Sequence, residues 1–226
     1  MPVPWHPDPP TISAPVCHTI ASAMLKKQLR VVRALLDAID PFPARKGLRR
    51  KVMQPGQDRV LGFTLGLTKK NDVKDRLVTS QYNNKFPELL LACQRLIAAV
   101  DKKLVWNCIQ VNKNQQTALH WDSYNEGPSV IVGLGDYEGG ALLLHYKDGP
   151  VPYSVKESFL HFDGRLPHST EQFSNPPRYT LVFFPLSMKY SKAIMASAPS
   201  DTSPPPCKNA ETRLKRRGVG HRVGAK

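Results

Sequence analysis

Residues 129–184 read SVIVGLGDYEGGALLLHYKDGPVPYSVKESFLHFDGRLPHSTEQFSNPPRYTLVFF, and this stretch decides the fold class of the 226-residue chain. Short runs rich in Val, Ile, Leu, Tyr and Phe alternate in it with Gly-Gly and Asp-Gly steps, which are typical of tight turns. Strands are expected here at 129–134, 141–146, 158–162 and 179–184, and just upstream at 105–111 and 117–121. Strands at this spacing favour a sandwich or barrel over a doubly wound parallel sheet.

The region before these strands is expected to supply two helices. Apolar residues recur at helical spacing over residues 16–39, up to the Asp40-Pro41 step, and a second helix is expected from Pro87 to Val100. Between them, residues 51–68 hold short apolar runs that predict a strand with a glycine-marked irregularity. We therefore expect a mainly β domain of the α+β class, in which the two N-terminal helices cover one sheet.

The composition indicates one globular domain with appendages, since 41% of the residues are apolar and 22% are charged. We expect a flexible N-terminus at 1–15, a single domain at 16–191 with its core at about 104–186, and a disordered basic tail at 192–226. The four cysteines show no paired spacing, and no apolar run approaches the roughly 20 residues that span a membrane. With no signal-peptide pattern at the start, we expect an intracellular protein that acts as a monomer.

The net charge of +14 is unevenly distributed along the chain. Residues 26–76 contain 14 basic and 5 acidic side chains, residues 207–226 contain 7 and 1, and residues 77–206 contain 11 of each. Lys and Arg clusters gain affinity for polyanions by releasing the counterions condensed on phosphates. The two basic segments therefore predict a nucleic-acid partner, DNA before RNA, although they could serve solubility alone. The cluster Arg213-Leu214-Lys215-Arg216-Arg217 further predicts nuclear localisation.

Five side chains in the β-rich half have the types and order of a metal site with an anion anchor. His120 and Asp122 stand two residues apart at the end of an expected strand, where their side chains point to one face. His168 lies in a turn between two later strands, and Arg178 opens the second of these, with Thr180 two residues on. Two imidazoles and one carboxylate on one side of a metal leave the opposite side open, as in iron(II) oxygenases, and an arginine fork suits a dicarboxylate. Taken singly, each residue has a simpler interpretation as a structural, turn or surface side chain.

The stretches LHWDSYNEGPSVIVGLGDYEGGALLLH (119–145) and FLHFDGRLPHSTEQFSNPPRYTLVFF (159–184) resemble the 2-oxoglutarate and iron(II)-dependent dioxygenase superfamily. The likeness is greatest to the branch with the ten-eleven-translocation methylcytosine dioxygenases and the base-J-associated thymine hydroxylases. It implies a double-stranded β-helix, a jelly-roll or cupin-like barrel. It also implies Fe(II) bound by His120, Asp122 and His168, 2-oxoglutarate held by Arg178 with Thr180, O2 as the oxidant, and ascorbate as a stimulant of turnover.

The resemblance implies oxidation of a methyl group on a nucleic-acid base, either 5-methylcytosine or thymine in DNA. Asn125 lies where that branch places a polar residue against the flipped target base, although it could equally be an asparagine in a turn. Methylcytosine oxidisers carry a base-contacting histidine shortly after the anchoring arginine, whereas this chain has Leu186 after Arg178, which leaves the identity of the base open. Two other hypotheses remain: a 2-oxoglutarate-dependent protein or peptide hydroxylase, and a basic nucleic-acid-binding module without enzymatic activity.

Overall fold

The structure of the chain is a computed structural model that describes residues 14–20, 22–46, 52–57, 59–69, 77–122 and 124–186. The predictions made for residues 1–13 and for the basic tail at 192–226 lie outside these residues, as do parts of the basic segment 26–76. None of the helices in the described part of the chain combines the length and the apolar character that a membrane crossing requires.

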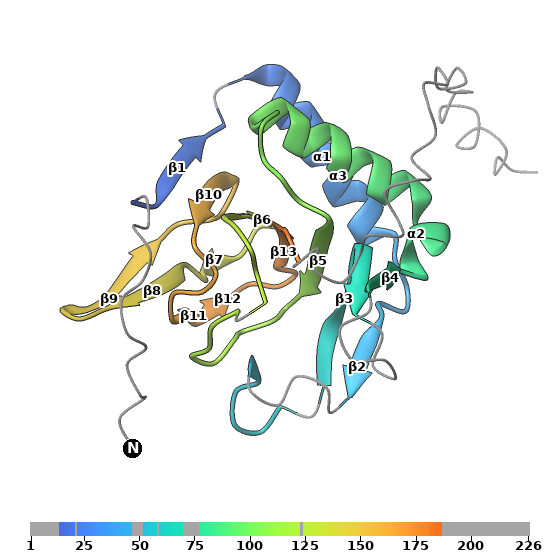
Figure 1. The fold of residues 1–226 in the computed structure, drawn as a ribbon. Coiled ribbons are helices and arrows are strands. Elements are labelled where there is room, and N and C mark those ends of the chain that lie inside the picture. The colour runs from blue at the N-terminus through green and yellow to red at the C-terminus, as the bar shows by residue number, and fades with distance from the viewer. Residues whose placement is uncertain are drawn as a thin grey trace, which may run out of the picture. The chain divides into compact units, whose positions relative to one another are not determined.

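The helices of the described residues are α1 (Ala23–Asp37), α2 (Tyr82–Lys85) and α3 (Pro87–Val100), shown in Figure 1. The strands are β1 (Val16–Thr19), β2 (Ala44–Lys46), β3 (Arg59–Lys69), β4 (Leu77–Thr79), β5 (Cys108–Lys113), β6 (Ser129–Leu134), β7 (Glu138–Gly139), β8 (Leu142–Tyr146), β9 (Gly149–Tyr153), β10 (Ser158–Phe162), β11 (His168–Thr170), β12 (Phe173–Ser174) and β13 (Tyr179–Phe184).

Antiparallel pairing arranges the strands in one large sheet and smaller sheets. The eight-stranded sheet has the order β1-β10-β6-β13-β5-β3-β2, and β4 pairs with β3 outside that order. A three-stranded sheet, β11-β8-β9, and a two-stranded sheet, β12-β7, complete the described part of the fold. The mainly β class, the double-stranded β-helix and the two supporting helices are therefore confirmed.

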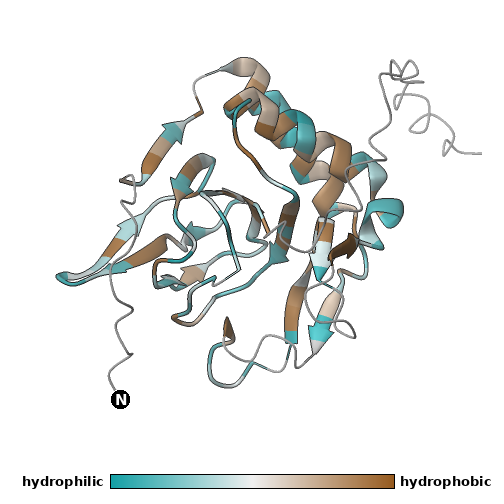
Figure 2. Cartoon of the chain, viewed as in Figure 1, coloured by the Kyte–Doolittle hydropathy of each residue, from teal (hydrophilic) through white to brown (hydrophobic). Residues whose placement is uncertain are grey.

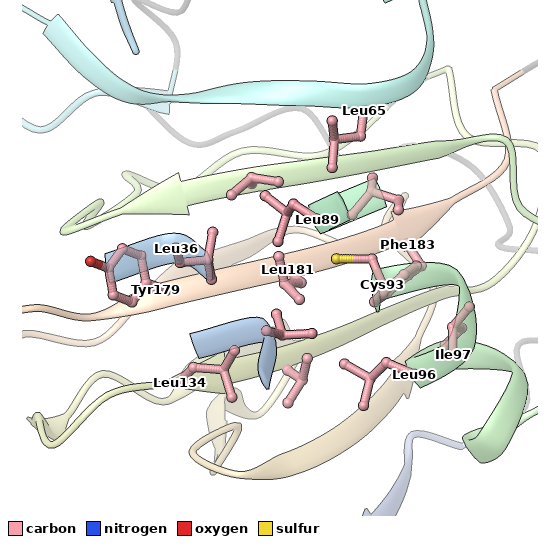
Figure 3. Close-up of a cluster of buried hydrophobic side chains, with 14 of the residues drawn as sticks. Leu36, Leu65, Leu89, Cys93, Leu96, Ile97, Leu134, Tyr179, Leu181 and Phe183 are labelled. Carbon is pink, nitrogen blue, oxygen red and sulfur yellow. The ribbon is translucent and has the colours of Figure 1, made fainter. Parts of the chain in front are cut away.

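One face of the large sheet forms the main core with helices α1 and α3. Because successive strand residues point to opposite faces, Leu181 and Phe183 of β13 lie on this side and are fully buried. They pack with residues of both helices, including Leu36 of α1 and Leu96 of α3, as Figure 3 shows. Each such side chain stabilises the fold by roughly 1.5–3 kcal/mol through removal of apolar surface from water. The strands therefore hold a fixed position beneath the helices.

The opposite face of the large sheet meets the smaller sheets through a second, smaller apolar cluster. Its members come from β6, β8 and β10 and the segment before β10, and they are Ile131, Leu142, Leu144, Val155, Leu160 and Phe162. Figure 2 shows that apolar and polar segments alternate along the strands as well as along α1 and α3. The rest of the space between the sheets is a cavity lined by both polar and apolar side chains, and the site lies there.

The structure corrects several sequence-based boundaries. The helix expected over 16–39 begins at Ala23, because the side chain of Ser22 accepts a hydrogen bond from the N–H of Leu25 and caps it. Residues Val16–Thr19 instead form β1, which pairs with β10. The strand expected at 117–121 is absent from the described residues; Thr117 and His120 make only isolated bridges there. His168 begins β11 and does not lie in a turn.

Candidate metal centre and anion anchor

His120, Asp122 and His168 converge in space, although no strand holds the first two. Each side chain offers one ligand atom, and the three atoms all lie within 4.8 Å of one another. Reciprocal backbone hydrogen bonds join His120 to His168 at 3.0 and 2.8 Å, which brings the loop carrying His120 against β11. The convergence expected from the sequence is therefore present, and its cause is this bridge between loop and strand.

The two imidazoles are oriented in the same way by backbone carbonyl groups. Nδ1 of His120 lies 2.8 Å from the carbonyl oxygen of Ala118, and Nδ1 of His168 lies 2.7 Å from that of Leu166. A carbonyl oxygen can only accept a hydrogen bond, so each Nδ1 must carry the proton. Each Nε2 then keeps a lone pair for a metal ion, which is how metal-binding histidines are normally fixed.

The protonation state of His168 also suits a metal ligand. Its side chain is buried, and this burial, followed by the neighbouring His120, lowers the pKa of His168 to about 4. The ring is therefore neutral near pH 7, as metal binding requires. Two imidazoles and one carboxylate form a donor set that fits Fe(II) and leaves coordination positions open.

Asp122 is held by the backbone of Gly164 and by the side chain of Asn125, a contact that the sequence did not indicate. Its backbone N–H donates to the carbonyl oxygen of Gly164 at 2.8 Å, and its carboxylate accepts a long, 3.5 Å hydrogen bond from Nδ2 of Asn125. A Cβ atom at Gly164 would lie 2.7 Å from Nδ2 of Asn125 and 3.3 Å from Oδ2 of Asp122. Gly164 therefore allows the carboxylate and its amide partner to approach the backbone, whereas the sequence indicated only a turn at that position.

The three metal-ligand candidates line a cavity of about 910 Å³ together with Arg178 and Thr180. The guanidinium of Arg178 donates to the carbonyl oxygens of Gln115 at 3.3 Å and Gly140 at 2.7 Å. Arg178 is only 3% exposed, yet its Nε atom has no hydrogen-bond partner in the part of the chain that the structure describes. Burial lowers the pKa of Arg178 below its ordinary value, but the group stays cationic at neutral pH.

Aromatic rings and a glycine hold the Arg178 side chain. The guanidinium carbon lies 5.1 Å from the ring centroids of both Tyr137 and Phe173. Gly140 has a φ of +70°, and a Cβ atom there would lie 2.6 Å from Nε of Arg178. The sequence did not indicate that Tyr137 supports Arg178.

A chain of side-chain hydrogen bonds runs along the floor of the cavity towards Thr180. Thr64 on β3 donates to Gln110 on β5 at 3.1 Å, and Gln110 donates to Asn112 at 2.9 Å. Asn112 in turn donates to Oγ1 of Thr180 at 3.1 Å. Because that oxygen already accepts a hydrogen bond, the Thr180 hydroxyl can donate its own proton to an anion beside Arg178.

Asn125 lies between the metal-ligand cluster and a second cavity. It is 6% exposed, and its Nδ2 donates to Oγ of Ser129 at 3.2 Å in addition to Asp122. It lines a cavity of about 530 Å³, to which Asp122, Tyr124 and Phe184 also contribute. These three residues line the first cavity as well, so the two cavities share walls.

No protein-family model and no curated protein matches the chain, whereas solved structures do. The chain is similar to an oxidoreductase of the 2OG-Fe(II) oxygenase family from Burkholderia pseudomallei, with 16% identity, a TM-score of 0.50, and coverage of 75% of this chain and 84% of that one. It is also similar to NgTET1 in complex with 5mC DNA, with 14% identity, a TM-score of 0.48 and coverage of 79% and 74%.

A further similarity is to a prolyl-4-hydroxylase from Pseudomonas putida, with 14% identity, a TM-score of 0.42, and coverage of 77% of this chain and 92% of that chain. The last two likenesses are too distant to bear on substrate. The first concerns the arrangement of strands and helices. The chain therefore has the fold of a 2OG-Fe(II) oxygenase.

Proposed function

We propose that the protein is an Fe(II)- and 2-oxoglutarate-dependent dioxygenase. The observation that carries this proposal is that the His120, Asp122 and His168 ligand atoms share one cavity with the buried cation of Arg178. Either feature alone has structural explanations. Their combination matches the two requirements of the reaction, which are a metal with open positions and a seat for a dicarboxylate.

In this proposal the chain binds and orients the reactants. His120, Asp122 and His168 would hold Fe(II), while Arg178 and Thr180 would bind the far carboxylate of 2-oxoglutarate. When bound, Fe(II) and 2-oxoglutarate supply the oxidation, in which O2 gives one oxygen atom to the succinate formed with CO2 and the other to a substrate C–H bond. The aromatic rings around Arg178 would keep water away from the ion pair and so strengthen it.

The electrostatics of Arg178 support an anionic ligand. A buried cation without a counter-charge is costly, and in the described residues no carboxylate lies within ion-pair distance of this guanidinium. Nη1 and Nη2 of Arg178 each donate one hydrogen bond to a carbonyl oxygen and have a second N–H, and the Thr180 hydroxyl also has a proton to donate. A dicarboxylate would supply the missing charge and accept these donors.

We further propose that the substrate is a methyl group on a nucleic-acid base, 5-methylcytosine or thymine in DNA. Two exposed aromatic residues, Trp121 and Tyr124, line the metal cavity, and their rings could stack on a base that has left the duplex. Asn125, which lines the second cavity beside Asp122, would contact the edge of the base. All these groups come from one chain, so we propose that a monomer acts, in the nucleus.

The test combines the full-length protein with Fe(II), 2-oxoglutarate and one of three candidate substrates. These are DNA containing 5-methylcytosine, the same DNA without it, and a mixture of proline-containing peptides. We expect succinate and an oxidised base, detected by mass spectrometry, with at least one of the DNA substrates. Succinate with peptides alone would overturn the proposed substrate, and no succinate under any condition would overturn the proposed activity.

A further inference from the structure

The second cavity contains two cationic side chains that the dioxygenase chemistry does not use. Arg45 of β2 and Lys69 of β3 both line it, together with the hydroxyl-bearing residues Thr64, Thr68 and Tyr82. Nη2 of Arg45 lies 3.5 Å from Oγ1 of Thr64, and Nζ of Lys69 lies 3.1 Å from the ring centroid of Tyr124. The cavity is therefore lined by several hydrogen-bond donors and by two positive charges.

Neither cation has a counter-charge among the described residues. No ion pair found there involves Arg45 or Lys69, and Asp122 is the sole carboxylate of the described residues that line this cavity. In the proposed function Asp122 is engaged by the metal. Burial lowers the pKa of Arg45 below its ordinary value, which reflects the cost of placing this charge in the cavity wall without a partner.

We infer that Arg45 and Lys69 bind a backbone phosphate of a single nucleic-acid strand whose adjacent base enters the metal cavity past Tyr124. This inference rests on the proposed function and specifies how its substrate is held. The Arg45 guanidinium offers a planar fork for phosphate oxygens, and Lys69 adds a point charge. Tyr124 belongs to both cavities, so a ligand can cross from the phosphate seat to the metal site along one wall.

The surroundings favour a nucleic acid over an acidic peptide. A phosphate seat beside exposed aromatic rings is the combination that single-strand binders use, because bases stack on the rings while cations follow the backbone. Here Tyr124 is 60% exposed and Trp121 is 42% exposed. The seat is also separate from Arg178, which lines only the first cavity, so it need not compete with a dicarboxylate.

The experiment measures binding of a fluorescent single-stranded oligonucleotide to the full-length protein over a range of salt concentrations. The test variant is Arg45→Gln with Lys69→Gln. The matched control is Arg95→Gln with Lys102→Gln, which removes the same charge from exposed positions in and just after helix α3. Arg45→Lys with Lys69→Arg preserves both charges and controls for damage to the cavity wall.

We expect the test variant to bind about tenfold more weakly at low salt, and the slope of log K against log salt to fall by roughly 0.7, the contribution of one single-strand phosphate contact. The control pair should change the affinity about twofold or less, and the charge-preserving pair should retain the slope. Equal losses of oligonucleotide affinity in the test and control pairs would overturn the inference. It would also be overturned if an acidic peptide displaced the oligonucleotide from proteins that keep Arg45 and Lys69 but not from the test variant.

Turnover of 2-oxoglutarate without substrate is measured on the same proteins and separates this inference from the proposed function. We expect the 2-oxoglutarate KM of the test variant to equal that of the unaltered protein, because Arg178 is unchanged. If the unaltered protein shows no turnover while replacement of Arg45 and Lys69 still weakens oligonucleotide binding, the dioxygenase proposal fails and the phosphate seat stands.

Discussion

The two faces of the large sheet carry different kinds of side chain on the same strands. On β5, Ile109 and Val111 pack against the helices, whereas Gln110 and Asn112 face the cavity. On β13, Leu181 and Phe183 pack on the helix side, and Thr180 faces the cavity together with the apolar Val182 and Phe184. One face therefore supplies the free energy of folding, and the other presents polar groups that a rigid backbone holds in place.

The cavity face also differs from the helix face in how its groups are satisfied. Apolar side chains on the helix face need only close packing. The polar groups of the cavity face are joined by the hydrogen-bond chain from Thr64 to Thr180, and Arg178 beside it keeps an unpartnered Nε among the described residues. Because the neighbouring polar groups of this face are hydrogen-bonded to one another, the unpartnered Nε of Arg178 indicates a ligand site here.

The largest effect should follow from a change at the cavity face that leaves the helix face untouched. We predict that Asp122→Ala reduces succinate formation more than about 100-fold, because loss of a metal ligand should exceed the effect of losing a group that merely supports one. The melting temperature should stay close to that of the unaltered protein, since Asp122 is half-buried in a cavity wall. Asp148→Ala, in an exposed turn, is the control. Substantial retained turnover would contradict the assignment of Asp122.

Adjacent phenylalanines on β13 test the helix face directly. Phe183 is fully buried among the helices, and Phe184 lines the cavities. We predict that Phe183→Ala lowers the free energy of unfolding by about 3–5 kcal/mol, because it opens a hole in a packed core. Phe184→Ala removes the same atoms and should cost clearly less. Equal losses in denaturant unfolding would show that the two faces do not divide stability and ligand binding in this way.

A substitution of Arg178, the proposed anion anchor, should change the affinity of the protein for 2-oxoglutarate. We predict that Arg178→Lys raises the KM for 2-oxoglutarate about tenfold, or ~1.4 kcal/mol, because an ammonium group cannot reproduce the two-pronged contact of a guanidinium. Arg165→Lys is the matched control, since Arg165 is exposed and pairs with the buried carboxylate of Asp163, and neither residue lines the cavity. Succinate formation at varied 2-oxoglutarate measures both. An unchanged KM would exclude Arg178 as the anchor.

The sequence predicts those elements whose signals are local. The helix from Pro87 to Val100 and the strands at 129–134, 158–162 and 179–184 match the structure at both ends, because each pairs a clear periodicity or apolar run with a turn signal. Strand β1 was predicted as helix. Its four residues are exposed and become a strand only through pairing with β10, far away in the chain.

The site, like the fold, depends partly on local sequence signals and partly on contacts between residues that are distant in the chain. The residue types and order of His120, Asp122 and His168 are visible in the sequence, whereas their convergence depends on backbone bonds from His120 to His168 and from Asp122 to Gly164. The contact of Arg178 with Gly140 joins residues 38 positions apart. The seat at Arg45 and Lys69 was hidden for the same reason, because nothing local relates either residue to Asp122.

His161 is a polar exception on the helix side of the sheet, and it should give the smallest effect. Its ring contacts His18 of β1, and Nδ1 lies 3.9 Å from Asp101 at the end of α3. Burial lowers the pKa of His161 below its ordinary value and His18 lowers it further, while Asp101 opposes both. The folded state therefore favours the neutral ring, and its contribution to stability is full above the unfolded pKa of about 6.5 and is lost as the pH falls through the folded pKa.

We predict that His161→Phe makes the melting temperature less sensitive to acid between pH ~7.5 and ~5.5. Phenylalanine keeps the ring contact with His18 but cannot be protonated, so the variant should avoid the part of the loss that comes from charging a buried imidazole. The difference should be at most about 2–4 °C, the shift that 1 kcal/mol produces in a domain of this size. If both proteins lose the same amount on acidification, charging of His161 does not contribute to the acid sensitivity of the fold.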